Sequence, residues 1–375
     1  MSRLKFIITC HTGFEEYSEI EAKRLGVDLV ERREGRIIVE GREESIYTLN
    51  KFGRTFHKVI ILLKRDVARN LSEIYSKVRS LDFSFIKPDQ KFAVRSERSG
   101  VHDFTSIDIA REAGRAVIDS YMADRGVRLG VDLDSPDVVI TVDLVGLDLF
   151  IGVDTTGESL HIREYRRYNH PSAIKPSLAS ALIIMSGWRG EPLLDPFTGG
   201  ATIPIEAALM AKARPVHENK DYLFRKLSFY SREEEETVTF KPPISPFPVD
   251  KIVAIEKKRK HFKGALKNVR TAEVSDLVNL ILDDCLKYKP EEPFSFIVTN
   301  PPYGIRSGRK DKVQILYKLF LDKVPRLLKE RGKLVIITTE HKPMKEVIED
   351  KGLKILKENL GRHGKLWVKA FLIEV

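Results

Sequence analysis

Five short apolar runs, mostly followed by segments with helical spacing of apolar residues, dominate this sequence from about residue 171 onward. They occupy residues 193–195, 251–255, 277–282, 294–298 and 333–338. Continuous rather than alternating apolar strands are typical of a parallel sheet that helices cover on both faces. The second half is therefore predicted to be a doubly wound α/β domain. In such folds ligands bind at the carboxyl ends of the strands, so the residues behind each run are the candidates for a site.

One segment interrupts this alternation. Residues 216–248 contain an acidic run at 233–236 and a proline cluster at 242–248. Long segments of this kind inside compact domains are uncommon, and they are typically binding loops, lids or linker segments. We predict a surface excursion that is partly mobile.

The residues behind the fourth run, Asn300-Pro301-Pro302-Tyr303, favour one kind of chemistry. The side chain of Asn300 and the main chain of Pro301 each offer a carbonyl, and Tyr303 can cover the flat face of a base or amide. A conjugated amino group is a poor nucleophile because its lone pair is delocalised. Two acceptors on its hydrogens would stabilise the positive charge that develops during attack, without a strong base. The motif predicts methyl transfer to a planar amino group, and the alternative is a proline-rich turn that ends a buried strand.

A glycine-rich loop follows the first run and opens a helix. Its sequence is Asp195-Pro196-Phe197-Thr198-Gly199-Gly200-Ala201-Thr202. Glycines let a ligand approach the backbone, and a helix N-terminus offers free N–H groups. The loop lacks both the dinucleotide fingerprint and the P-loop lysine, which disfavours dinucleotides and triphosphates. Asp195 suits a cationic amino group such as that of a methionine moiety, and an N-capped turn is the alternative.

Acidic residues follow the second and third runs. Glu256 can accept both hydroxyls of a ribose, and Asp283 and Asp284 lie where a carboxylate can accept an adenine amino group. Each acid alone is also typical of a helix start or a solvated loop. Independent turns would rarely place such residues behind four successive strands.

On these motifs, residues 170–375 resemble the Rossmann-like methyltransferases that use S-adenosyl-L-methionine to modify exocyclic amino groups. The resemblance assigns catalysis to Asn300, Pro301 and Tyr303. The segment 170–179 resembles the lead-in that packs over the cofactor. The excursion makes the spacing between the glycine loop and Glu256 longer than in the family pattern. The cofactor-binding residues implied by the resemblance are Asp195, Phe197, Thr198, Gly199, Gly200, Ala201, Glu256, Asp283, Asp284 and Asn300.

Charge and cysteine usage narrow the partners. The 375 residues carry a formal net charge of +10, and excess Lys and Arg attract polyanions, so RNA or DNA is the first expectation. Cys10 and Cys285 lie outside any disulfide or zinc spacing, so no metal is expected. Neither a signal peptide nor an apolar run near 18 residues is present, so we expect a cytoplasmic protein without a membrane partner.

The first half has an α+β pattern of short strands and helices. Residues 92–98, 102–110 and 139–154 resemble a THUMP domain, an RNA-binding module that engages the single-stranded 3′ end of tRNA and often follows a small ferredoxin-like domain. The resemblance makes Arg95, Arg98 and His102 candidate RNA contacts, because guanidinium groups bind phosphate oxygens and stack on bases. Ordinary exposed charges are the alternative for each residue.

The predicted order is a ferredoxin-like domain (1–57), a THUMP domain (58–156), a linker (157–170) and a Rossmann-fold methyltransferase domain (171–375). This order resembles the archaeal and bacterial tRNA (guanine-N2)-methyltransferases, and among them best those acting on guanosine 6. The implied partner is tRNA, through its acceptor stem and 3′ end, and a monomer is expected. Enzymes for guanosine 10, for N6 of adenine or for another amino group remain alternatives. So does a non-catalytic tRNA-binding protein that kept the fold.

Overall fold

A nine-stranded sheet organises the first half of the chain. The computed structural model describes residues 3–302 and 310–375. The strand order is β2-β3-β1-β4-β9-β8-β5-β7, with β6 beside β8. The elements of this half are β1 (Arg3–Thr9), α1 (Glu15–Arg24), β2 (Asp28–Arg33), β3 (Arg36–Arg42), α2 (Ser45–Phe52), β4 (Lys58–Val67), α3 (Leu71–Arg79), β5 (Lys91–Arg95), β6 (Arg98–Ser99), α4 (Ser106–Arg125), β7 (Gly130–Val131), β8 (Val138–Val145) and β9 (Asp148–Asp154).

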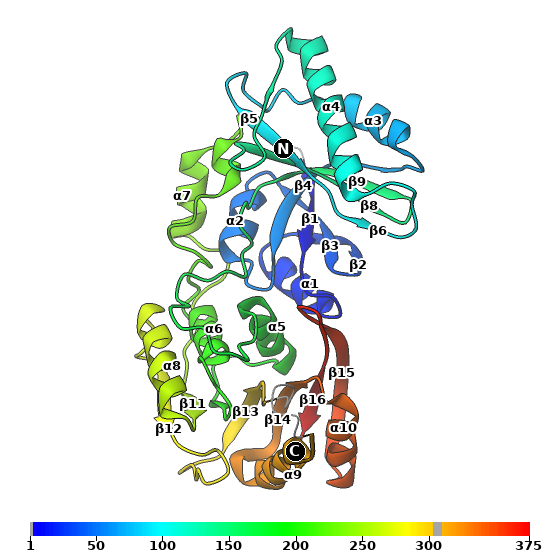
Figure 1. The fold of residues 1–375 in the computed structure, drawn as a ribbon. Helices are drawn as coiled ribbons and strands as arrows, with labels where there is room; N and C mark the ends of the chain where they lie inside the picture. Colours follow the sequence, from blue (N-terminus) through cyan, green and yellow to red (C-terminus); the bar gives the residue numbers. More distant parts are fainter. Residues whose placement is uncertain (1–2, 303–309) are drawn as a thin grey trace.

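Strand β4 joins the two units that the sequence analysis placed in this half. It pairs antiparallel with β1 on one side and with β9 on the other. The ferredoxin-like and THUMP-like units therefore share one sheet, with β1 to β3 in the first and β5 to β9 in the second. Figure 1 shows α3 and α4 at one end of the molecule, α1 and α2 in the middle, and the second half of the chain, apart from α7 (Arg232–Phe240), at the other end.

A seven-stranded sheet organises the second half, in the order β12-β11-β10-β13-β14-β16-β15. The first five strands in this order are parallel, as predicted, and β16 and β15 add an antiparallel edge that was not predicted. The elements are α5 (Pro176–Ser186), β10 (Leu193–Asp195), α6 (Thr202–Ala211), a 3-10 helix η1 (Leu223–Lys226), α7 (Arg232–Phe240), β11 (Ile252–Glu256), α8 (Arg259–Thr271), β12 (Val278–Leu282), β13 (Phe294–Thr299), α9 (Lys310–Leu327), β14 (Leu328–Thr338), α10 (His341–Asp350), β15 (Lys354–His363) and β16 (Leu366–Glu374).

Helices cover both faces of the second sheet. Alternate residues of each strand point to opposite faces, so Leu193 and Ala254 pack against α5, α6 and α8, whereas Leu194 and Val253 pack against α9 and α10. This two-sided burial is why the strands read as continuous apolar runs. The doubly wound α/β prediction is confirmed.

The prediction of a surface excursion at 216–248 is wrong for its first part, because residues 216–227 pack into the protein, whereas most of residues 228–248 lie at the surface. Tyr222, Phe224 and Leu227 are buried in the core of the first half, and α7 lies beside α2 (Figure 1). Lys51 of α2 and Glu235 of α7 form an ion pair of 2.9 Å with both side chains almost fully buried. The excursion therefore attaches the second half of the chain to the first.

The C-terminal hairpin makes a second attachment. Asn359 of β15 accepts a hydrogen bond from the Tyr17 hydroxyl at 2.7 Å, and Lys357 contacts Glu16. The backbone N–H of Arg362 donates to the carbonyl of Thr12 at 3.0 Å. The excursion and the C-terminal hairpin thus hold the first half in a defined position relative to the carboxyl edge of β10 to β13.

Candidate active site

Four strand ends place the predicted cofactor and catalytic residues along one edge of the second sheet. The strands lie in the order β12, β11, β10, β13. Asp283 directly follows β12, Glu256 ends β11, Asp195 ends β10, and Asn300 directly follows β13. Neighbouring strands lie about 4.8 Å apart, so the four side chains form a short row. The chain order reverses between β10 and β13, which is where doubly wound sheets bind ligands.

A pocket of about 410 Å³ opens at this edge. Its volume is within the range of small-molecule sites. Of the predicted residues, Asp195, Phe197, Thr198, Gly199, Glu256, Asp283, Asp284 and Asn300 line it. Gly200, Ala201 and Pro301 are buried beside the pocket and are not part of its lining.

The glycine loop needs glycine at one position. Gly199 has a φ of +56°, a conformation that costs other residues about 1–2 kcal/mol, and a Cβ there would lie 3.2 Å from the His170 ring. Ala201 directly precedes α6, and its N–H donates to the Thr198 carbonyl at 2.8 Å. The Asn268 side chain of α8 donates to the carbonyls of Gly200 and Tyr168, both at 3.0 Å. The glycine loop therefore leads directly into α6 and is held by a hydrogen-bonding side chain of α8.

Asp195 is a buried carboxyl at the centre of the row. It accepts hydrogen bonds from Thr299 Oγ1 at 2.7 Å and from the Phe197 N–H at 3.3 Å. Burial raises its pKa to about 7, although these donors partly offset the effect. Within the described ranges no Lys or Arg forms an ion pair with it. Such a carboxylate would gain from a ligand that brings a positive charge.

The acids of β11 and β12 differ in their surroundings. Glu256 Oε1 accepts a hydrogen bond from the Lys258 N–H at 2.7 Å, which fixes it at the start of α8. Asp283 Oδ1 accepts from the Asp284 N–H at 2.7 Å, and Asp284 Oδ2 accepts from Lys257 Nζ at 2.7 Å. Partial burial opposes ionisation of Asp284, but the bond from Lys257 lowers its pKa overall. Glu256 and Asp283 thus line the pocket as loop-anchored carboxylates, and Asp284 does so as half of an ion pair.

The Asn300 motif lies partly inside the described residues. Asn300 Nδ2 donates to the Ser172 carbonyl at 3.3 Å, which turns the amide nitrogen toward the segment that leads into α5. Pro302 lines the pocket, and its carbonyl accepts a hydrogen bond from the Tyr317 hydroxyl at 3.2 Å. The predicted role of Tyr303 lies outside the described residues. The role of the Pro301 carbonyl stays a prediction.

Sequence reasoning missed two histidines of the pocket wall. The rings of His170 and His261 meet edge to face with centroids 4.3 Å apart, and the Tyr168 hydroxyl lies 2.5 Å from His261 Nδ1. Burial, together with the nearby His261 and Lys258, lowers the pKa of His170 to about 4, so it is neutral at physiological pH. Only the segment containing His170 carried a signal, as the predicted lead-in. His261 had none, because its role depends on where α8 packs.

The predicted RNA contacts lie in the first half, away from this pocket. Arg98 Nη1 donates to the Gly100 carbonyl and to His102 Nδ1, both at 3.1 Å, and His102 Nε2 donates to the Gly146 carbonyl at 2.7 Å. Arg95 instead donates to the Leu133 carbonyl. Arg98 and His102 thus form one cluster and Arg95 stands apart. Their RNA-binding role stays a prediction.

Three family descriptions match consecutive parts of the chain. Residues 5–60 match the RlmL ferredoxin-like domain, residues 68–154 match the THUMP domain, and residues 163–369 match the RMKL-like methyltransferase domain. The third match covers more than half of the chain and includes the whole row of strand-end residues.

Two archaeal relatives extend over nearly the whole sequence. A tRNA (guanine(6)-N2)-methyltransferase from Archaeoglobus fulgidus is 39% identical over 99% of this chain and 92% of its own. One of the same name from Methanocaldococcus jannaschii is 37% identical over 99% of this chain and 100% of its own. This chain belongs to the tRNA (guanine(6)-N2)-methyltransferase family.

A solved structure shares the fold of this methyltransferase family member throughout. It is a methyltransferase complexed with SAH, 23% identical, with a TM-score of 0.87 over 99% of this chain and 98% of that chain. At this identity the likeness concerns the fold alone. It includes the placement of the first half on the second.

The pocket of this tRNA (guanine(6)-N2)-methyltransferase family member fits the cofactor of such enzymes. Asp195 is buried and lacks a cationic partner among the described residues. Gly199 leaves space that a side chain would fill. In the described ranges no helix is long and apolar enough to cross a bilayer, and no cluster of three or more His, Cys, Asp or Glu could hold a metal ion.

Proposed function

We propose that this protein transfers a methyl group from S-adenosyl-L-methionine to the exocyclic N2 of a guanosine in tRNA, namely guanosine 6 of the acceptor stem. One observation carries the proposal. The acceptor motif at Asn300 and the carboxyl of Asp195 lie on neighbouring strands at one pocket, linked by the 2.7 Å bond from Thr299. The names of the two archaeal relatives support the choice of N2 and of position 6.

The cofactor would supply an electrophilic methyl group on a sulfonium. Asp195 would bind its α-amino group, because an ionised buried carboxyl favours a cation. Glu256 would accept the ribose hydroxyls, and Asp283 and Asp284 would lie at the adenine. Phe197, Thr198, Gly199, Gly200 and Ala201 would form the loop around the methionine part.

Asn300 and the Pro301 carbonyl would orient the guanine amino group, with Tyr303 stacked on the base. The attack needs neither a thiolate nor a strong base. Burial raises the pKa of Cys285, which lines the pocket, to about 12, so it is not a thiolate at neutral pH. This favours amino methylation over carbon-5 methylation of a pyrimidine, which uses an attacking thiolate.

The first half would hold the acceptor stem and 3′ end of tRNA, with Arg95, Arg98 and His102 as contacts. A base inside a duplex hides its amino nitrogen, so the target guanosine would be unpaired or flipped into the pocket. A monomeric, cytoplasmic protein and domain boundaries at 57, 156 and 170 complete the proposal. Gel filtration with light scattering would test the first of these.

Labelled S-adenosylmethionine and unmodified tRNA transcripts test the function. We expect N2-methylguanosine at position 6, and no label in a transcript with adenosine at that position. Label at guanosine 10 would favour the enzymes of that site. Finding N6-methyladenosine, or label in protein only, would overturn the proposal, and binding of tRNA without any transfer would favour a non-catalytic binding protein.

A further inference from the structure

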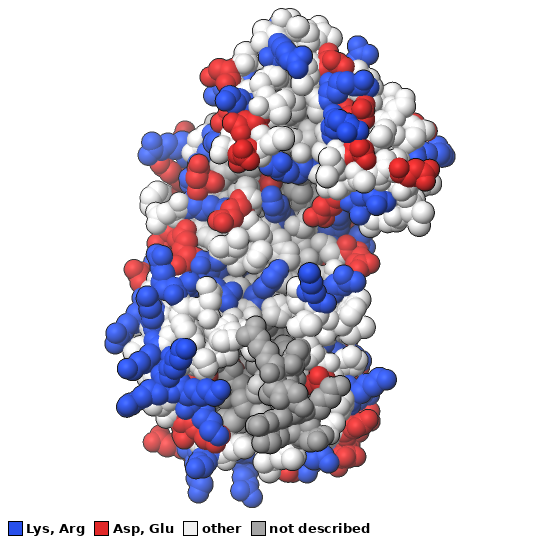
Figure 2. Space-filling view, in the orientation of Figure 1, with Lys and Arg blue, Asp and Glu red and all other residues white. Residues whose placement is uncertain are grey.

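The exposed side of α8 carries a concentration of positive charge beside the pocket. Between Lys257 and Thr271 the sequence has no Asp or Glu. Figure 2 shows the corresponding blue cluster on the lower half of the molecule, over α8. The exposed cations of this stretch are Lys258, Arg259, Lys260, Lys263, Lys267 and Arg270.

These cations differ from their neighbours in having no acidic partner. Lys212, Arg214 and Lys257 form ion pairs with Asp276, Glu273 and Asp284. None of the six exposed cations of the stretch forms an ion pair within the ranges that the structure describes. A surface that serves only solubility mixes both signs of charge. The six exposed cations of this stretch are instead available to a negatively charged partner.

The positions of the cations form a stripe along the helix. Lys260, Lys263, Lys267 and Arg270 are spaced three or four residues apart and therefore lie on one side of α8 over about 15 Å. The other side is buried, and the ring of Tyr168 packs so closely on Gly264 that a Cβ there would lie 2.2 Å from it. The stripe is therefore fixed in position relative to the pocket.

The stripe leads from the pocket toward the first half. At the N-terminal end of α8, where the stripe starts, the neighbouring residues Lys257, Lys258 and His261 line the pocket. At its end, Glu273 is paired at 3.0 Å with Arg214, whose carbonyl accepts a hydrogen bond from Arg54 of the first half.

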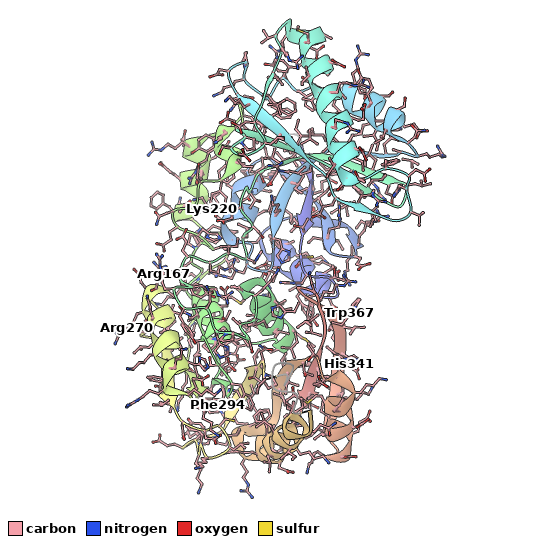
Figure 3. The ribbon with its side chains drawn as sticks, in the orientation of Figure 1. Arg167, Lys220, Arg270, Phe294, His341 and Trp367 are labelled. Carbon is pink, nitrogen blue, oxygen red and sulfur yellow. The ribbon has the colours of Figure 1, made fainter. Side chains whose placement is uncertain are left out.

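A further arginine continues the line at that end. The Tyr168 N–H donates to Asn268 Oδ1 at 2.8 Å, which holds the neighbouring Arg167 near α8. Figure 3 shows Arg167 just beyond Arg270 on the side of the first half. Arg167 is exposed, as the cations of the stripe are.

We propose that this stripe, Lys260, Lys263, Lys267 and Arg270, binds the sugar-phosphate backbone of the RNA substrate next to the target nucleotide. Lysine and arginine side chains on one helix face bind phosphates without reading sequence, and their role is to set the register of the base at the pocket. The inference rests on the proposed function for the identity of the RNA. It adds a contact surface between the pocket and the first half.

Binding of an unmodified tRNA transcript at several KCl concentrations tests the stripe. The variant Lys263→Gln/Lys267→Gln/Arg270→Gln removes three charges, and the control Lys5→Gln/Lys329→Gln/Lys365→Gln removes three exposed charges that also lack an ion pair among the described residues. We expect the stripe variant to raise Kd about tenfold or more and to lower the slope of log K against log salt by about 2, at roughly 0.7–0.9 per lost phosphate contact. The control should change Kd less than twofold.

Two further readouts separate this inference from the proposed function. SAH affinity should stay within about twofold in the stripe variant, because none of its three altered residues lines the pocket. Equal Kd and slope in the two variants would overturn the proposal. Unchanged RNA affinity with lost binding to polyglutamate would also overturn it, in favour of an acidic protein partner. If the unaltered protein methylates nothing, the proposed function fails while the RNA comparison still decides the role of the stripe.

Discussion

Thr299 Oγ1 donates a hydrogen bond to Asp195 Oδ1 across 2.7 Å, and so connects the strand before the Asn300 motif to the strand before the glycine loop. Both residues are almost fully buried. The bond couples the two functions assigned to this edge, because any shift of one strand end moves the other. The hydrogen-bond donors to Asp195 are all neutral among the described residues. No positive charge therefore offsets burial, which raises the pKa of Asp195 to about 7.

Cofactor binding should therefore weaken in mild acid. A cationic amino group needs the ionised form of Asp195, and below pH 7 that form becomes the minority. For a carboxyl with a pKa of about 7, the Kd of SAH should be about tenfold higher at pH 6 than at pH 8 in isothermal titration. Asp195→Asn should bind weakly at both values with little pH dependence. An unchanged dependence in that variant would assign the effect to another group.

The same carboxyl predicts the pH dependence of stability. Its folded pKa lies above the ordinary value of 3.8, so its contribution is fully present below pH 3.8 and is lost as pH rises through 7. The substitution Asp195→Asn should consequently change the Tm of the ligand-free protein more favourably at pH 8 than at pH 5. Differential scanning calorimetry at both values would measure it, and an equal Tm change at both would contradict the assigned pKa.

Asn300→Ala should abolish methyl transfer and leave cofactor binding largely intact. Loss of a preorganised acceptor typically costs about 10²–10³ in rate. Asn300→Asp is the matched control, because it keeps an oxygen at Oδ1 while losing the donor to Ser172. We expect it to retain more activity than the alanine variant. If both variants also lose SAH binding, Asn300 serves the cofactor rather than the acceptor amine.

The parts of this site that sequence could predict are those fixed by a single strand and its turn. Leu193 and Phe294 begin strands as expected because two-sided burial leaves an unbroken apolar run. The contacts of Asn268 and His261 depend on where α8 packs against the rest of the domain, which no local sequence pattern encodes. The β15–β16 hairpin was missed because polar residues such as Lys357 and Asn359 contact the first half instead of solvent. The aromatic residues Tyr222 and Phe224 were the available signal that the first part of the excursion is buried.

Gly199→Ala should weaken cofactor binding more than Gly200→Ala. At Gly199 the φ of +56° and the 3.2 Å approach of the His170 ring both oppose a side chain. At Gly200 a Cβ would meet neighbours at 3.5 Å and 3.6 Å, which is ordinary contact. The strain at Gly199 corresponds to about 1–2 kcal/mol, or roughly a tenfold rise in the Kd of SAH if it is relieved by moving the loop. Equal effects in the two variants would show that space above the loop, rather than backbone conformation, decides the affinity.

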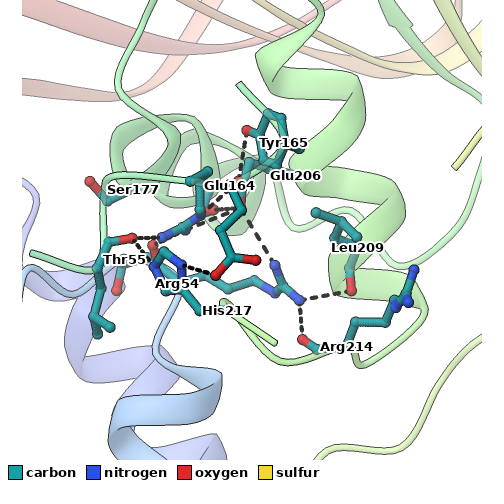
Figure 4. Close-up of polar contacts among 12 residues, drawn as sticks. Arg54, Thr55, Glu164, Tyr165, Ser177, Glu206, Leu209, Arg214 and His217 are labelled. Atoms are coloured by element: carbon teal, nitrogen blue, oxygen red, sulfur yellow. Dashed lines mark hydrogen bonds and ion pairs between the residues drawn. The ribbon is translucent and has the colours of Figure 1, made fainter. Parts of the chain in front are cut away.

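A buried polar cluster joins the two halves behind the site. Glu206 of α6 accepts hydrogen bonds from Arg163 Nε at 3.0 Å, from the Tyr165 hydroxyl at 2.9 Å and from the Ser180 hydroxyl at 3.0 Å. Arg54 of the first half lies 3.5 Å from Glu206 and donates to the carbonyls of Leu209 and Arg214 (Figure 4). Burial opposes ionisation of Glu206, but Arg163 and Arg54 lower its pKa overall.

Glu206→Gln should be among the most destabilising conservative changes in the chain. It leaves Arg54 and Arg163 buried without the carboxylate with which they form ion pairs, and breaking a buried pair in this way costs about 3–5 kcal/mol. Because the pKa of Glu206 is lowered, its contribution is present above the ordinary value of 4.5 and is lost as pH falls through the folded value. Urea unfolding at pH 7 would measure the loss. Glu236→Gln, which breaks an exposed pair with Arg232, is the control and should cost about 0.5 kcal/mol or less. A Glu206 variant as stable as that control would mean that the excursion and the C-terminal hairpin, rather than this cluster, hold the halves together.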